Sequence, residues 1–355
     1  MSATQQIGVF RQPPREHFSL WLESIMVDLR MDPTTGNWII VDAPSSWNDT
    51  SRQPSACPFC PGQEEFNPPP ITTINDAKGN WLIRVFPDKF PVFSIEETLG
   101  REGEGVYNKM HNFGAHELII ENPTHGISFS SLEINEIAKI ISVYRDRVTD
   151  LTQDRRLRYI LIFKNQGEAT GSHINHVHSH LIATPVIPQR IDLELRAARK
   201  HYHFKERCLF CDIIRQEQEQ KLRIVDGNGE FVALCPFAPR FPYETWILPL
   251  QHFSSFQNHL HSQETFTALA ALLKTTLKRI ENFTSAYHFV LHISPNEKSA
   301  FFASEEWDFL PHGFHWHLEI LPRISKIARF KREEEFFTNP LTPEEAAKKL
   351  KAVNI

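Results

Sequence analysis

The chain has 355 residues, a length for which two domains are expected. Its composition of 41% hydrophobic, 11% aromatic and 23% charged residues excludes a disordered protein. The formal net charge is −5 and basic residues form no long run, so we expect no nucleic-acid partner. No apolar stretch approaches the roughly 18 residues of a membrane span and no secretion signal is recognisable, so we expect no membrane partner and a cytoplasmic location.

The predicted elements occur twice in the same order along the chain. The first copy begins with a C-x-x-C pair (57–60), a β-rich run (81–93) and a segment that ends in histidine (116–125). It continues with an amphipathic helix (130–151), which has a capping box at Ser130 and Glu133, then a strand (158–165) and an H-x-H (176–178). The second copy repeats them at 208–211, 222–237, 243–252, 262–283, 287–294 and 315–317. This repetition predicts an α+β protein with domains 1–190 and 191–355.

Two further helices are expected outside the repeated elements. The charged segment near residues 191–207 predicts a helical connector between the copies. The sequence TPEEAAKKL near the C-terminus has a proline at its start and acidic residues in its first turn, which predicts a terminal helix.

Four of the five cysteines form two C-x-x-C pairs, a pattern that indicates metal or redox chemistry in a reducing compartment. Tetrahedral zinc takes two thiolates and two imidazoles, and we prefer it to a redox disulfide because matching histidines recur in both copies. We therefore predict one or two structural zinc ions, bound by Cys57, Cys60, His125 and His176 in the first copy and by Cys208, Cys211, His252 and His315 in the second. The fifth cysteine, Cys235, is expected to be a buried small hydrophobe.

A loop punctuated by glycine, Asn165–Asn175, lies between a predicted strand and the first H-x-H. Its backbone N–H groups could surround an anion, although a plain turn would have the same composition. The second histidine of the H-x-H, His178, is left over from the metal set, and we expect it on the opposite face of its strand from the metal. Histidines outside these sets, among them His116 and His288, are expected in packing or at the surface.

The sequence FKNQGEATGSHINHVHSH at residues 163–180 resembles the pattern F-x-N-x-G-x-x-x-G-x-S-x-x-H-P-H-x-Q of the galactose-1-phosphate uridylyltransferase branch of the histidine-triad superfamily. The segments DPTTGNWIIV, HELIIENPTH and HWHLEILPRI are similar to further family segments. The resemblance implies two tandem histidine-triad-like units that form a pseudo-dimer, a homodimer in solution, and ping-pong transfer of a nucleotidyl group through His178. It also implies substrate-binding positions at Asn165, Gly167, Gly171, Ser172, His173, Asp88 and Phe90.

The chain departs from this family pattern at several positions. The family glutamine two residues after the nucleophile is His180 here, which we count as a second catalytic candidate and which favours hydrolysis or an altered acceptor. Two basic family positions fall at Ser45 and Asn48, and the segment that holds the sugar phosphate reads KREEE at residues 331–335. Galactose specificity is therefore not assumed, and the donor is either a UDP-hexose or an ADP-sugar, with a sugar phosphate or phosphate as acceptor.

Three functions and two metal sets stay open at this stage. The leading function is a nucleotide-sugar nucleotidyltransferase; the alternatives are a nucleotide hydrolase of histidine-triad type and a zinc-stabilised nucleotide-binding pseudoenzyme. The resemblance also offers a different second metal set, Glu194, His292, His315 and His317. We prefer the thiolate set because His315 is not expected to serve both.

Overall fold

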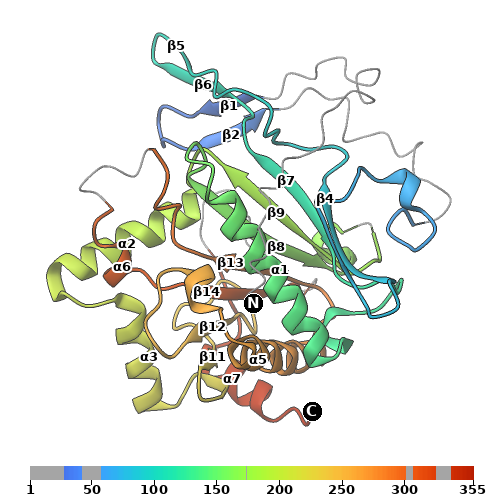
Figure 1. Cartoon of the computed structure of the whole chain (residues 1–355). Helices are drawn as coiled ribbons and strands as arrows, with labels where there is room; N and C mark the ends of the chain where they lie inside the picture. The colour runs from blue at the N-terminus through green and yellow to red at the C-terminus, as the bar shows by residue number, and fades with distance from the viewer. Residues whose placement is uncertain (1–27, 42–56, 173, 301–306, 325–336) are drawn as a thin grey trace, which may run out of the picture.

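The computed structural model describes residues 28–41, 57–172, 174–300, 307–324 and 337–355. A ten-stranded sheet, in which all neighbouring strands run antiparallel, forms its centre (Figure 1). Its first five strands in space are β3 (Thr72–Asn75), β4 (Trp81–Pro87), β7 (Ala115–Ile120), β9 (His178–Thr184) and β8 (Tyr159–Gln166). The other five are β13 (Tyr287–His292), β14 (His317–Pro322), β12 (Thr245–Pro249), β11 (Phe231–Leu234) and β10 (Ile224–Gly227).

The strand order of the sheet is mirrored about its middle. Each half of the chain contributes five strands, and within each half the fourth and fifth strands along the chain exchange places in space. The halves join where β8 pairs antiparallel with β13. A smaller antiparallel sheet has the order β2-β1-β6-β5 and comprises β1 (Asp28–Met31), β2 (Trp38–Val41), β5 (Glu102–Glu104) and β6 (Tyr107–His111).

The two predicted amphipathic helices are present as α1 (Ile134–Leu151) and α5 (Gln263–Glu281), which pack against each other and lie over the sheet (Figure 1). Their apolar stripes are buried as the spacing predicts. The capping box of α1 is shifted from the predicted one: Glu133 is the N-cap and Glu136 completes the box. Ser130 instead donates to Glu281 at the end of α5, at 2.5 Å.

The remaining helices lie at the edges of these layers. They are α2 (Gln189–Lys205), α3 (Leu209–Gln220), α4 (Phe256–His259), α6 (Leu310–Gly313) and α7 (Pro343–Lys351). Helix α2 confirms the expected connector, and α7 confirms the expected terminal helix, capped by the side chain of Thr342. In the described part of the chain, no helix combines the length and apolarity that a bilayer span requires.

Alternation of side chains along the strands divides the sheet into an apolar face and a polar face. On the apolar face, a small cavity between the sheet and helices α1 and α5 is lined by Ile141, Tyr144, Phe256, Leu269, Leu273, Phe289, Leu291 and Leu318. Leu181 and Ile320 are fully buried in the same core. His178, His180, His317 and Glu319 alternate with these core residues, so they lie on the opposite face of the sheet, which the apolar Leu118 and Ile120 share.

Cys235 is fully buried in the core. Burial raises the pKa of its thiol to about 12. It therefore packs as a small uncharged side chain, as the sequence predicts.

Candidate active site and metal clusters

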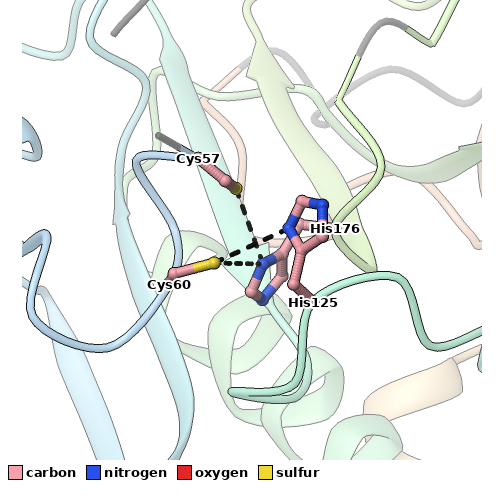
Figure 2. Close-up of side chains that lie close together, drawn as sticks. All are labelled: Cys57, Cys60, His125 and His176. Carbon is pink, nitrogen blue, oxygen red and sulfur yellow. Dashed lines mark hydrogen bonds between the residues drawn. The ribbon is translucent and has the colours of Figure 1, made fainter. Parts of the chain in front are cut away.

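The four side chains of the first predicted metal set converge on one point (Figure 2). The Sγ atom of Cys57 lies 3.6 Å from Nδ1 of His176, and the Sγ atom of Cys60 lies 3.6 Å from Nδ1 of His125. A tetrahedral zinc ion with ordinary bond lengths requires sulfur–nitrogen distances of about 3.6 Å. The donor atoms are therefore spaced as a tetrahedral metal site requires.

The orientation of His176 also suits a metal ligand. Its Nε2 atom donates a hydrogen bond to the main-chain oxygen of Asn122 at 2.7 Å. This bond fixes the tautomer and leaves the lone pair of Nδ1 directed at the cysteines.

The second set, Cys208, Cys211, His252 and His315, forms an equivalent cluster. The Sγ atom of Cys211 lies 3.4 Å from Nδ1 of His252 and 3.6 Å from Nδ1 of His315. A hydrogen bond from the Cys208 thiol lowers the pKa of Cys211, which favours the thiolate that a metal requires. Main-chain oxygens of Pro311 and Pro249 accept from the Nε2 atoms of the two histidines.

The rival second set exists beside the thiolate set rather than in its place. Glu194, His292 and His317 cluster with Glu319, and His315 takes no part in this cluster. His315 thus belongs to the thiolate cluster alone, as preferred from the sequence, and Glu319 takes the fourth place in the other cluster. Burial disfavours the charge of Glu319, but His292 and Arg240 hold its pKa at about 2.

His178 lies at the start of β9 and is 7% exposed. Its Nδ1 atom donates to the main-chain oxygen of His176 at 2.6 Å, so Nε2 keeps its lone pair. Burial, and then the nearby Lys164 ammonium, lower the pKa of the imidazole. The residue is thus held as a neutral imidazole with one free nucleophilic nitrogen.

The expectation that the metal and His178 occupy opposite faces was wrong. The ring of Phe59, which lies between the first two cysteines, has its centroid 6.0 Å from that of His176 and 5.8 Å from that of His178. Residues two apart on an extended chain point the same way, so ligand and nucleophile share a side. The second half repeats the packing, with Phe210 against His317 at 4.8 Å.

A buried ionic network, which the sequence analysis missed, supports the strand that carries His178. The Lys164 ammonium is fully buried, pairs with the Glu121 carboxylate, and donates to the main-chain oxygen of His178 at 2.5 Å. Tyr144 and Ser179 donate to the same carboxylate at 2.5 and 2.6 Å. No local sequence pattern marks these residues, because their partners come from separate elements.

The glycine-punctuated loop turns sharply between β8 and β9. Its glycines Gly167 and Gly171 have φ angles of 83° and 82° and bound the short 3-10 turn Glu168–Thr170. The side chain of Asn165 accepts from Nδ1 of His288 at 2.6 Å, which gives that histidine an unexpected place beside the loop. Ser172 lies at the end of the turn, and His173 lies outside the described residues.

The two glycines allow a matched test of the loop. A Cβ atom at Gly167 would lie 3.1 Å from Ala286, whereas a Cβ atom at Gly171 would meet open space. Gly171→Ala is expected to lower the free energy of unfolding by about 1 kcal/mol, and Gly167→Ala by about 2–3 kcal/mol. Urea denaturation of both variants checks this order, and equal losses would contradict the close approach at Gly167.

The side chains of Asp88, His116 and His180 meet next to the nucleophile. Nε2 of His116 lies 3.2 Å from Nδ1 of His180 and 3.4 Å from Oδ2 of Asp88. The ring of His180 stacks on Phe163 at 5.0 Å, and its centroid is 5.2 Å from that of His178. Burial lowers the pKa of His180 to about 3. His116 was expected in packing or at the surface, and no sequence pattern indicated that it meets Asp88 and His180.

Of the remaining positions singled out from the sequence, the structure describes Phe90 but not those on the acceptor side. Phe90 is 64% exposed, and its backbone N–H donates to the side chain of Asp88 at 2.8 Å. Ser45, Asn48 and residues 331–335, on which the departures at the acceptor side were argued, lie outside the described residues.

Comparison with known proteins first defines the class. Residues 22–188 match the family described as "Galactose-1-phosphate uridyl transferase, N-terminal domain". An ADP-glucose phosphorylase of Arabidopsis thaliana is 31% identical over 348 residues, covering 94% of this chain and 95% of the relative. A galactose-1-phosphate uridylyltransferase of Thermotoga maritima is 28% identical over 338 residues, covering 93% and 99%. The class is thus one of nucleotidyltransferase and phosphorylase enzymes of the nucleotide-sugar type.

The fold agrees with this class. The crystal structure of the Arabidopsis ADP-glucose phosphorylase with bound ADP-glucose superposes with a TM-score of 0.73 at 30% identity, covering 92% of this chain and 99% of that one. The chain belongs to the galactose-1-phosphate uridylyltransferase family.

Proposed function

We propose that the protein is a nucleotide-sugar nucleotidyltransferase that works by ping-pong transfer through a nucleotidyl group on His178. The observation that carries the proposal is the state of His178: a neutral ring, oriented by the main-chain oxygen of His176, with Nε2 available as nucleophile. We assign phosphate binding to Asn165, Gly167, Gly171 and Ser172, supported by the sharp glycine-bounded turn at Glu168–Thr170; His173, the remaining predicted contact, lies outside the described residues.

Two features guide the choice of donor and acceptor. The Arabidopsis relative, at 31% identity, is an ADP-glucose phosphorylase. Asp88 and the exposed ring of Phe90 lie on the loop after β4, where we assign them to the base and ribose. We therefore propose an ADP-sugar as donor, with ADP-glucose the first to test, and inorganic phosphate as acceptor; a UDP-hexose with a sugar phosphate is the alternative pair.

The proposed reaction has two displacements at the α-phosphorus. In the first, Nε2 of His178 attacks, a phosphorus–nitrogen bond forms, and the bond to the bridging oxygen breaks, releasing glucose 1-phosphate. In the second, an oxygen of inorganic phosphate attacks the nucleotidyl-histidine, the phosphorus–nitrogen bond breaks, and ADP leaves. His180, next to the nucleophile, is the second catalytic candidate. Backbone N–H groups of the loop would meet the developing negative charge.

We also propose zinc for both Cys2His2 clusters. The donor distances support it, since they match tetrahedral geometry, and two thiolates with two imidazoles are typical ligands of structural zinc. When bound, the metal ties the C-x-x-C loop to the H-x-H segment. With all four positions filled by protein, it would take no direct part in the displacements.

The mirrored strand order supports an arrangement of two tandem histidine-triad-like units, residues 1–190 and 191–355, as a pseudo-dimer. The matched packing of Phe59 on His178 and of Phe210 on His317 supports the same arrangement. A homodimer of the whole chain stays a prediction, to be measured by analytical ultracentrifugation.

Intact-mass spectrometry after mixing the protein with ADP-glucose tests the function directly. The wild type is expected to gain the mass of one adenylyl group, and inorganic phosphate added afterwards should remove it and yield ADP. His178→Ala should show no gain and lose at least about 10³-fold in turnover, because no other group replaces the nucleophile. UDP-glucose in place of ADP-glucose tests the alternative donor.

The same samples separate the remaining alternatives. A hydrolase would release AMP carrying ¹⁸O from labelled water without added phosphate. A nucleotide-binding pseudoenzyme would bind ADP-glucose with neither adduct nor product. Either result would contradict the proposed transfer.

A further inference from the structure

Three neighbouring strands bring Asp88, His116 and His180 together on the polar face of the sheet. In the pairing of β7 with β9, Leu118 lies opposite His180, and His116 is two residues along the same face. Asp88 follows the last residue of β4, and its backbone N–H donates to the main-chain oxygen of His116 at 2.8 Å. The register of the sheet thus fixes the backbone positions of all three side chains.

A single hydrogen on Nε2 of His116 can at best be shared between the other two converging atoms. Oδ2 of Asp88, at 3.4 Å, and Nδ1 of His180, at 3.2 Å, both face Nε2 of His116. An ionised carboxylate only accepts, and a neutral imidazole nitrogen carries at most one hydrogen. One hydrogen on Nε2 serves the carboxylate or His180, while a cation at the centre accepts a lone pair from each of the three atoms.

The distances also suit a metal. At metal–ligand lengths of about 2.0–2.1 Å, a tetrahedral ion separates its nitrogen and oxygen ligands by about 3.3–3.4 Å. The two contacts of His116 Nε2, 3.2 Å to His180 and 3.4 Å to Asp88, are close to this value. Two imidazoles and a carboxylate leave at least one coordination position open, as in catalytic rather than structural sites.

We propose that Asp88, His116 and His180 form a third metal site, for a divalent cation of the zinc type, with an open position beside His178. His180 lies two residues after His178, the second histidine of the first H-x-H. The equivalent position in the second half, two residues after His317, is Glu319, which forms ion pairs with Arg240 and Arg190. In the first half an imidazole occupies that place, and its neighbours are a second imidazole and a carboxylate.

The role of such a cation rests on the proposed function, with one change: Asp88 would contact the nucleotide through the cation, and the assignment to the base and ribose would stay with Phe90. One carboxylate and two neutral imidazoles leave a net charge of +1 on a divalent site. A phosphate oxygen of the nucleotide is the natural fourth ligand, since the ring of His180 is 5.2 Å from that of the nucleophile. The cation would bind the nucleotide phosphates and offset their charge next to Nε2 of His178.

Zinc content after equilibrium dialysis against a small excess of zinc, without nucleotide, tests the site. The two Cys2His2 clusters, and any ion at Glu194 and its neighbours, contribute equally to all variants, so the difference between variants is the measurement. We expect wild type to hold one zinc per chain more than His180→Gln. The independent variant Asp88→Asn, just after the end of β4, should show the same loss.

His203→Gln is the matched control, because His203 is exposed on α2 and should keep the wild-type zinc content. Equal zinc in wild type, His180→Gln and Asp88→Asn would overturn the proposal and leave a hydrogen-bonded trio. A failure of the proposed function is seen separately, as the absence of an adduct with ADP-glucose whatever the zinc count.

Discussion

Replacing Lys164 by methionine is expected to lower the free energy of unfolding by about 3–5 kcal/mol. Lys164 and Glu121 are both fully buried, and the ammonium compensates a carboxylate that has no access to water. Methionine fills a similar volume but leaves that carboxylate as an unpaired buried charge. It also removes the donor to the main-chain oxygen of His178. Urea denaturation at neutral pH measures the loss.

The exposed pair of Lys109 with Glu102, at 2.9 Å, is the control. Lys109→Met should lower the free energy of unfolding far less than Lys164→Met does, because water screens both charges. Adding Glu121→Gln to Lys164→Met should recover part of the loss, since the uncompensated charge is gone. Similar losses for Lys164→Met and Lys109→Met would contradict the role assigned to the buried network.

The second large effect is expected from Cys60→Ser and Cys211→Ser, one ligand from each thiolate cluster. Each variant should lose one zinc per chain and unfold on the order of 10 °C lower, because metal binding contributes to folding free energy. Cys60→Ser should in addition slow adenylyl-adduct formation strongly. The reason is that the first cluster holds His176, whose main-chain oxygen orients His178.

Cys211→Ser should leave adduct formation close to wild type at temperatures where the variant is folded, since its cluster lies in the other half of the sheet. Cys235→Ser is the control for a buried cysteine outside both clusters and should keep all zinc. Unchanged zinc content in Cys60→Ser or Cys211→Ser would show that the clusters do not hold the metal.

Local patterns were enough to predict much of this molecule. The stripes of α1 and α5, the strands β8 and β13 and the C-x-x-C pairs are each encoded by spacing within a short segment. The histidines of the metal sets lie far from the cysteines along the chain and were found because the same order of elements occurs twice. The shift of the α1 cap from Ser130 to Glu133 shows where this fails. A pattern of polar residues allows two caps, and the tertiary partner of Ser130, Glu281, decides between them.

Features that depend on pairing between distant segments could not be predicted in the same way. Nothing near Lys164 reveals that Glu121 faces it, and nothing near His116 reveals that Asp88 and His180 lie on adjoining strands. The relation between the two second-half metal sets likewise depended on Glu319, whose role appears only once β14 pairs with β13 and with β12. Spacing along the sequence identifies candidate ligands within one segment. Which side chains of other segments lie next to them depends on the register of strand pairing.

Within the ten-stranded sheet, the two halves join at one strand pair, β8 with β13. If either half were alone, β8 or β13 would become an edge strand, and its backbone N–H and C=O groups on that side would lose their partners. Such an edge pairs readily with any strand of similar register, including the same strand of another molecule. By pairing with β8, strand β13 of the second half covers this edge, and we expect the first half expressed alone to self-associate.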